Sequence, residues 1–236
     1  MKIITNERKK KRNRRIAIIS TLIGMAILIS GLVISLRFPD QVTYSLLALL
    51  LGFLFAQIGI FFTNRWGRNP STDVLINQAL KGLDQKYTLC HYYTPTYHLL
   101  SGPAGIWILY PYHLTGTITY KNGRWRHKGS TFLRFFGKET LGRPDLELPY
   151  EIEKIQKFLK PLFAEETPPP VRAALVFTNP KITLEIDPAE NPPAPSLHLD
   201  KLKDFLRKEA KQKPISLEKV EKINAFLAQY EEGTKN

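Results

Sequence analysis

The hydrophobic pattern divides the chain into two parts. Residues 16–36 and 42–62 are two runs of 21 residues without a charged side chain, and a short polar turn at residues 37–41 separates them. A helix of about 20 apolar residues crosses the hydrocarbon core of a bilayer, which is about 30 Å thick. We therefore predict a transmembrane hairpin made of residues 16–36 and 42–62. A linker over residues 63–72 and an α/β domain over residues 73–236 follow it.

Two other interpretations of the apolar runs have to be weighed. A cleavable signal peptide has an apolar region of about 7–15 residues, shorter than the first run, and here a second run follows at once. A buried hairpin in a soluble protein would need an unusually large core around two uncharged helices. The pattern thus favours membrane insertion. Glycines at positions 24, 31, 52 and 59 would allow close helix approach within the hairpin or between copies, or are simply common in such helices.

Charge is distributed unevenly along the chain. Residues 1–70 contain 11 Lys/Arg and 2 Asp/Glu, a net charge of +9, whereas the remainder contains 23 and 19, a net charge of +4. The first 15 residues form a basic N-terminal segment. Its cluster could attract anionic lipid at about 1 kcal/mol per charge. The basic residues of this cluster are Arg8, Lys9, Lys10, Lys11, Arg12, Arg14 and Arg15.

The same cluster predicts the orientation of the hairpin. Arg65 and Arg68 follow the second run, whereas the turn between the runs has only Arg37, offset by Asp40. Because Lys and Arg collect on the cytoplasmic side, both termini and the α/β domain are expected in the cytoplasm. The predicted location is the inner (plasma) membrane of a bacterium.

Alternation of short apolar runs and turns predicts the α/β domain. Apolar runs at residues 99–100 and 106–109 flank a Gly- and Pro-containing segment, which is typical of two adjacent strands. A further strand begins after Gly116, and Lys121-Asn122-Gly123 predicts a tight hairpin turn. Residues 171–178 are almost all apolar, as in a strand buried on both faces. The same criteria predict helices over residues 73–83, 130–141, 150–163, 200–210 and 216–230, and strands over residues 87–93, 182–186 and 196–199.

Residues 97–118 resemble the core of the nuclease-related domain (NERD) family, which has a restriction-endonuclease-like fold. In that family an Asp-His pair is followed by three apolar residues, Gly-Pro-x-Gly, four apolar residues, Glu, one apolar residue and Lys. The resemblance implies an α/β fold with a mixed sheet flanked by helices. Residues in register with the family are His98, Gly102, Pro103, Gly105 and Gly116.

The catalytic positions of the family are changed in this chain. Tyr97, Tyr110 and Tyr112 stand where the resemblance places Asp, Glu and Lys. A tyrosine hydroxyl, with a pKa of about 10, is neutral at pH 7 and a poor ligand for Mg²⁺. We therefore expect a degenerate nuclease site with no metal or other cofactor. Tyr110 and Tyr112 should point to the same face of their strand. A relocated metal site would have to use other acids, namely Asp84, Glu139 or Asp145.

Two further groups of residues are candidates for binding. Three histidines at positions 91, 98 and 113 lie in or beside strands, where structural roles are commoner than metal ligation. The second group is basic, with Tyr120 and Trp125 interleaved. It is either a patch that binds nucleic acid or phosphate, or an ordinary solvated hairpin. Its members are Lys121, Arg124, Arg126 and Lys128.

Together these observations predict a membrane-anchored, catalytically degenerate nuclease-related protein that binds or scaffolds. One alternative is an active membrane-tethered nuclease with a relocated metal site. Another is a lipid- or protein-binding module unrelated to nucleic acid.

Overall fold

A computed structural model describes residues 1–129, 140–163, 166–212 and 214–233. Within this part the chain forms two units. Unit 2 consists of the helical residues Glu7–Thr72, and unit 1 is an α/β structure that combines Met1–Asn6 with the described residues from Asp73 onward. Most of the helix predicted over residues 130–141 lies outside the described residues, so that prediction is not addressed.

Unit 2 is a helical hairpin. Its elements are α1 (Glu7–Arg37), α2 (Val42–Phe62) and the π-helix η1 (Thr63–Gly67). The bounds predicted for the second helix are confirmed, whereas the first helix begins nine residues earlier than predicted. The 31 residues of α1 extend for about 46 Å at 1.5 Å per residue. The basic cluster therefore forms the first turns of a long helix and is not an extended tail.

Glycines allow α1 and α2 to approach closely. A Cβ atom added at Gly52 would lie 2.6 Å from Cγ of Leu28, and one added at Gly24 would lie 2.9 Å from the backbone nitrogen of Ala56. Such distances would force the helices apart, so the small residues act within the hairpin. The outward faces are apolar and both helices are long and apolar enough to cross a membrane. Large side chains that are more than half exposed include Ile18, Ile19, Leu22, Leu32, Leu46, Leu47, Leu49, Leu50 and Phe53.

The core of unit 1 is a mixed six-stranded sheet in the order β1-β2-β3-β4-β7-β9. The strands β2, β3 and β4 are antiparallel, β1 is parallel to β2, and β4, β7 and β9 are parallel to one another. The predicted strand pair around the Gly-Pro turn and the buried strand β7 are confirmed. The bounds are β1 Lys2–Thr5, β2 Thr88–His91, β3 His98–Gly102, β4 Gly105–Tyr112, β7 Val171–Phe177 and β9 Ser196–His198.

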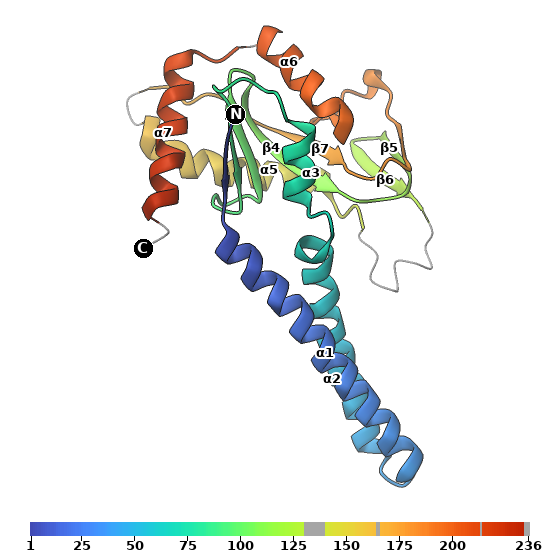
Figure 1. The fold of residues 1–236 in the computed structure, drawn as a ribbon. Helices are drawn as coiled ribbons and strands as arrows, with labels where there is room; N and C mark the ends of the chain where they lie inside the picture. The colour runs from blue at the N-terminus through green and yellow to red at the C-terminus, as the bar shows by residue number, and fades with distance from the viewer. Residues whose placement is uncertain (130–139, 164–165, 213, 234–236) are drawn as a thin grey trace. The chain divides into compact units, whose positions relative to one another are not determined.

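Strand β1 corrects the predicted domain boundary. Residues 1–15 are not one basic segment, and unit 1 does not begin at residue 73, because the first six residues belong to its sheet. The backbone N–H of Asn6 donates to the carbonyl oxygen of His91 at 3.0 Å. The side chain of Ile4 is only 1% exposed. The helical hairpin is therefore an insertion between the first and second strands of one sheet (Figure 1).

A second sheet in unit 1 has three strands in the order β6-β5-β8. We call it the small sheet; its strands are β5 (Gly116–Lys121), β6 (Arg124–Lys128) and β8 (Ile182–Glu185). The predicted hairpin is confirmed, with positive φ at Asn122 and Gly123 as a tight turn requires. Its strands form a sheet separate from the large one.

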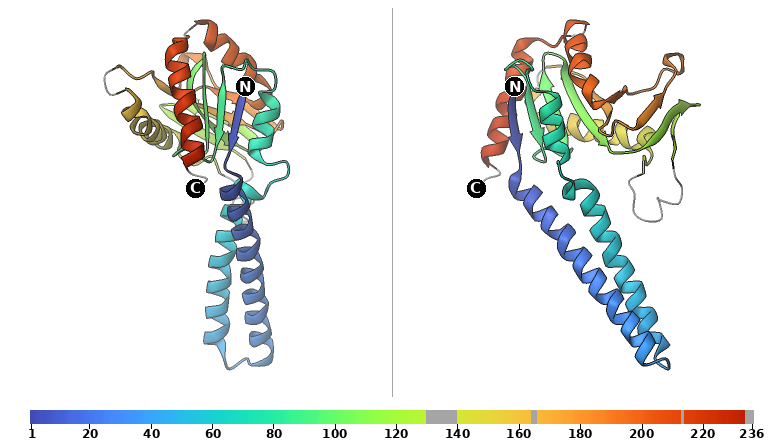
Figure 2. Two further views of the ribbon diagram at one scale, coloured as in Figure 1. Left: turned by 60° about the vertical axis from the view of Figure 1, so that its left-hand side comes forward. Right: turned by 45° about the vertical axis from the view of Figure 1, so that its right-hand side comes forward.

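Helices cover both faces of the large sheet (Figures 1 and 2). On one face α3 and α6 bury Ile76, Leu80, Leu202 and Leu206. On the other face α5, α7 and the inner side of the small sheet bury Ile155, Leu159, Ile223, Leu227, Ile118 and Trp125. The bounds are α3 Thr72–Ala79, α5 Pro144–Leu159, η2 Lys160–Phe163, η3 Pro188–Glu190, η4 Leu199–Lys201, α6 Leu202–Gln212 and α7 Leu217–Gly233.

Helix α5 begins earlier than predicted, at Pro144 instead of residue 150. Proline is common at the first helical position because its missing N–H has no intrahelical partner there. This earlier start brings Glu147 to Tyr110 of strand β4, where it bears on the candidate site.

Candidate functional site

Tyr110 and Tyr112 lie together on β4. Their ring centroids are 5.4 Å apart, and the ring of Tyr112 stacks on Phe177 of β7 at 5.8 Å. The prediction that both side chains point to one face is confirmed. That face is the one covered by α5 and α7, and Tyr112 is only 4% exposed there. The aromatic rings thus fill a packed core where the resemblance would place a glutamate and a lysine.

Tyr97 lies in the loop before β3. Its ring centroid is 6.4 Å from that of Tyr92, and its carbonyl oxygen accepts a hydrogen bond from the N–H of Tyr92 at 2.8 Å. These two contacts close the loop between β2 and β3. The structure therefore brings Tyr110 and Tyr112 into one cluster, whereas Tyr97 lies in a loop where it contacts Tyr92.

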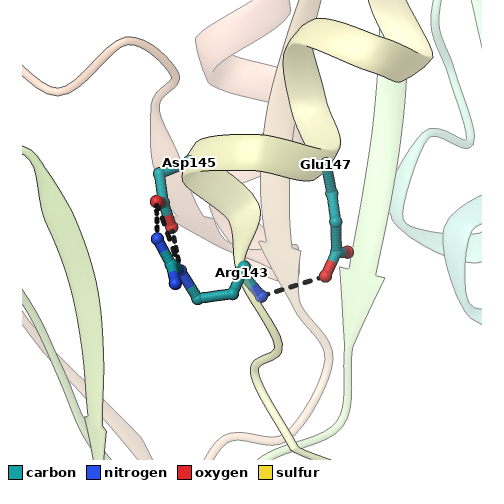
Figure 3. Close-up of polar contacts among 3 residues, drawn as sticks. All are labelled: Arg143, Asp145 and Glu147. Atoms are coloured by element: carbon teal, nitrogen blue, oxygen red, sulfur yellow. Dashed lines mark hydrogen bonds and ion pairs between the residues drawn. The ribbon is translucent and has the colours of Figure 1, made fainter.

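Glu147 is the acid that meets Tyr110. The hydroxyl of Tyr110 donates to Oε2 of Glu147 at 2.7 Å. The backbone N–H of Arg143 donates to Oε1 of Glu147 at 2.9 Å, as Figure 3 shows. Gly142 has φ +67°, and a Cβ atom there would lie 2.5 Å from Oε1, so glycine leaves room for the carboxylate. Sequence reasoning missed Glu147 because it placed the start of this helix at residue 150.

Asp145 is one of the three acids considered for a relocated metal site. Its carboxylate forms an ion pair with the Arg143 guanidinium at 2.8 Å (Figure 3). This hydrogen bond lowers the pKa of Asp145, and Arg124 contributes a smaller attraction. Asp84 instead accepts the N–H of Lys86 in an exposed turn, and Glu139 lies outside the described residues. Among the described residues no group of three or more His, Cys, Asp or Glu side chains is arranged to hold a metal ion.

Two of the three histidines are in direct contact. Nδ1 of His91 lies 2.7 Å from Nδ1 of His98, and Nε2 of His91 lies 3.0 Å from Oδ1 of Asn77 on α3. Burial, and then the neighbouring His91, lower the pKa of His98 well below its ordinary value. His113 instead lies 2.9 Å from the hydroxyl of Thr178. The histidines therefore join secondary-structure elements, as expected of structural residues.

The glycines that carry the family resemblance have packing roles. A Cβ atom at Gly102 would overlap the ring of Tyr87. Gly105 has φ +110°, and a Cβ atom there would lie 2.7 Å from Nη2 of Arg172. That guanidinium donates to the carbonyl oxygen of Ala104 at 2.7 Å and forms an ion pair with Glu209 on α6. The glycine motif thus lets a ring and a guanidinium approach the turn between β3 and β4.

The four basic residues of the small sheet lie on one face. Arg124 is directly opposite Lys121, Arg126 opposite Thr119 and Lys128 opposite Thr117. Opposite residues share a face and alternate residues return to it, so all four cations point the same way. We call this side of β5, β6 and β8 the basic face. All four side chains are exposed, and none forms a salt bridge with another residue in the described part of the chain.

The aromatic residues between these cations point to the opposite side. Tyr120 and Trp125 are only 6% and 5% exposed, and their ring centroids are 4.7 Å apart within the core. The indole N–H of Trp125 donates to the hydroxyl of Ser196 on β9 at 3.1 Å. The sequence interleaves basic and aromatic residues, but the strand separates them onto two faces. The basic face therefore offers charge without exposed rings.

Comparison with known proteins yields no relative. The chain matches no family model, no curated protein and no solved structure. The resemblance to the NERD family accordingly rests on the residues quoted from the sequence.

Proposed function

We propose that this chain is a membrane-anchored protein that binds nucleic acid through the basic face and does not cleave it. The observation that carries the proposal is the collection of four exposed cations on one side of the small sheet, backed by a packed core. Phosphate contacts by Lys and Arg supply most of the non-specific affinity of proteins for nucleic acid. The basic face would bind nucleic acid through its charge without cleaving it, since tyrosines stand where the resembled family has its catalytic residues.

Membrane insertion of unit 2 is supported by its exposed surface. A core helix of a soluble protein buries its large apolar side chains, whereas those on both helices here are outward and exposed. Residues on both sides of the hairpin also belong to unit 1. Because one folded sheet cannot lie on both sides of a bilayer, the chain must cross an even number of times between β1 and β2. Two crossings by α1 and α2 meet this condition.

The basic first turns of α1 support a cytoplasmic position for unit 1. Residues 7–15 occupy about 13 Å of helix before the uncharged run begins. If the uncharged run spans the bilayer, a segment of this length would lie at the level of the lipid headgroups, where cations interact with anionic lipid and favour the cytoplasmic side. The exposed members of the cluster are Arg8, Lys11, Arg12, Arg14 and Arg15.

The absence of nuclease activity is proposed from the chemistry of β4. A working site of the resembled family needs carboxylates for a divalent metal and a lysine for the attacking water. Tyr110 and Tyr112 supply neutral hydroxyls, and the carboxylate of Glu147 already accepts two hydrogen bonds. The mixed sheet with helices on both faces supports a degenerate member of the restriction-endonuclease-like class.

Topology can be tested with C-terminal fusions in a bacterial host. We expect a fluorescent-protein fusion to fluoresce and an alkaline-phosphatase fusion to be inactive, because unit 1 faces the cytoplasm. The reverse pattern would contradict the orientation. Recovery of the chain in the soluble fraction without detergent would contradict membrane anchoring.

Binding can be tested with the full chain in nanodiscs of neutral phosphatidylcholine, using a fluorescent 20-base-pair DNA. Changing Lys121, Arg124 and Arg126 together to Ala should reduce the slope of log affinity against log salt by about 2.7, at about 0.9 per lost phosphate contact. A control removes the same charge from Lys201, Lys208 and Lys211, which are also exposed in unit 1. If the basic-face variant keeps the original slope, this face does not bind nucleic acid.

A further inference from the structure

We propose that the basic face binds the phosphate backbone of double-stranded nucleic acid and does not read its bases. The inference rests on the proposed function and deepens it by naming the form of nucleic acid that the face fits. Three features of the small sheet carry it: the spacing of the cations, the direction of the aromatic rings and the polar character of the remaining side chains.

The cations form a short rigid row. Arg124, Arg126 and Lys128 alternate along β6, and Lys121 lies across from Arg124 on β5. Two-residue steps along a strand measure about 6.8 Å, so the row is about 14 Å long. A B-form duplex carries one phosphate charge per about 1.7 Å of its axis, so about eight charges, spread around both strands, fall within that length. A duplex therefore presents a dense, pre-ordered array of anions to a rigid sheet.

Single-stranded nucleic acid would find no exposed aromatic ring for stacking on the described strands β5, β6 and β8. Proteins that bind single strands stack bases on exposed aromatic side chains, which contribute about 1–3 kcal/mol per base. The only rings on β5 and β6 apart from His127 are Tyr120 and Trp125, and both are buried on the inner side. An unstacked flexible strand would also lose conformational freedom on binding. The face thus favours a duplex over its separated strands.

The same face is a poor match for a lipid surface. Binding of a protein surface to a membrane depends on buried apolar area as well as on charge. Apart from the cations, the residues that share this face are Thr117, Thr119, Thr183 and Glu185; Thr119 is buried between its neighbours, and none of the four has a large apolar side chain. A linear polyanion needs no apolar insertion. We therefore assign nucleic acid, and make lipid binding an outcome of the test.

Glu185 adds a negative charge beside the row of cations. It is exposed on β8 and pairs in register with Thr119, which is itself opposite Arg126. Two inter-strand spacings separate Glu185 from Arg126 by about 9.6 Å. A phosphate bound by Arg126 would lie at about this distance from Glu185, and a unit charge there in water changes its affinity by about twofold. Glu185→Gln should therefore increase the affinity for a duplex about twofold at 10 mM salt, a gain that loss of folding cannot mimic.

The experiment compares three probes with the full chain in neutral nanodiscs. The probes are a 20-base-pair DNA duplex, one of its strands alone, and vesicles containing phosphatidylserine. We expect the duplex to bind more tightly than the single strand, and duplexes of different sequence to bind equally. Glu185→Gln should strengthen duplex binding, whereas Glu218→Gln, which removes an exposed acid from α7, should leave it unchanged.

The outcomes separate this inference from the proposed function. If the single strand binds the basic face as tightly as the duplex, or if affinity follows base sequence, backbone recognition of a duplex is wrong while nucleic-acid binding stands. If neither nucleic acid depends on Lys121, Arg124 and Arg126, both are wrong. Vesicle binding that the same three substitutions abolish, without duplex binding, would assign the face to lipid instead.

Discussion

Replacing Ile4 by alanine should destabilise unit 1, although Ile4 lies only three residues before the long apolar helix α1. Ile4 is 1% exposed and packs in the core with Cys90 and Leu99. The substitution removes three carbon atoms, worth about 2.4 kcal/mol at about 0.8 kcal/mol each. Isoleucine-to-alanine changes in cores cost about 2–5 kcal/mol. An edge strand can shift inward, so we expect about 2–3 kcal/mol.

The neighbouring Ile3 provides a matched control. It has the same side chain in the same strand, but points to the other face and is 46% exposed. Ile3→Ala leaves no closed cavity and should cost about 1 kcal/mol or less, in keeping with the small effects of surface substitutions. The difference between the two variants in unfolding free energy measures the effect of burial, because both make the same change in strand propensity.

The assay is urea unfolding of the full chain in detergent micelles, followed by tryptophan fluorescence. Trp66 of unit 2 is replaced by Phe in every variant, so that Trp107 and Trp125 report on unit 1 alone. With a urea slope of about 2 kcal/mol per molar, Ile4→Ala should lower the midpoint by about 1 M or more. Equal midpoints for Ile4→Ala and Ile3→Ala would refute the placement of the N-terminal strand in the sheet.

Three further predictions follow from the same structure. The backbone N–H of Asn6 donates to the carbonyl oxygen of His91, and the hydroxyl of Tyr92 donates to the carboxylate of Asp73. Joining Asn6 to Asp73 by a short Gly/Ser linker should therefore give a soluble protein that melts at a higher temperature than residues 73–236 alone. The full chain with Mg²⁺ or Mn²⁺ should not nick supercoiled plasmid; metal-dependent nicking that Tyr110→Ala abolishes would contradict a degenerate site. Burial lowers the pKa of His98, so below pH 6.5 the unfolded chain binds a proton that the folded chain does not. The free energy of unfolding should then fall with decreasing pH by up to about 1.4 kcal/mol per unit, and His98→Gln should flatten the urea midpoints measured between pH 7 and pH 5.

Local signals in the sequence predicted much of the architecture. The uncharged run at residues 42–62 set the bounds of α2, because length and hydropathy alone decide whether a helix can cross a bilayer. The turn at Asn122-Gly123 predicted the β5–β6 hairpin, since its backbone requires positive φ. Continuous apolar character identified β7 as a strand covered on both faces. Each of these signals lies within the element that it specifies.

The features that the sequence did not predict depend on packing between residues far apart in the chain. Lys2–Thr5 pairs with Thr88–His91, more than 80 residues away. A run of four residues is too short for its hydrophobic pattern to indicate which strand it pairs with. Tyr110 meets Glu147 only because α5 begins six residues before its amphipathic pattern becomes clear. From the sequence, the cations of β6 and the interleaved rings were grouped as one candidate patch; alternation along the strand separates them onto two faces, and which face enters the core depends on the neighbouring sheet and helices. The pattern of the chain thus determined the elements, whereas the burial of Trp125 and the exposure of Arg124 were decided by what packs against them.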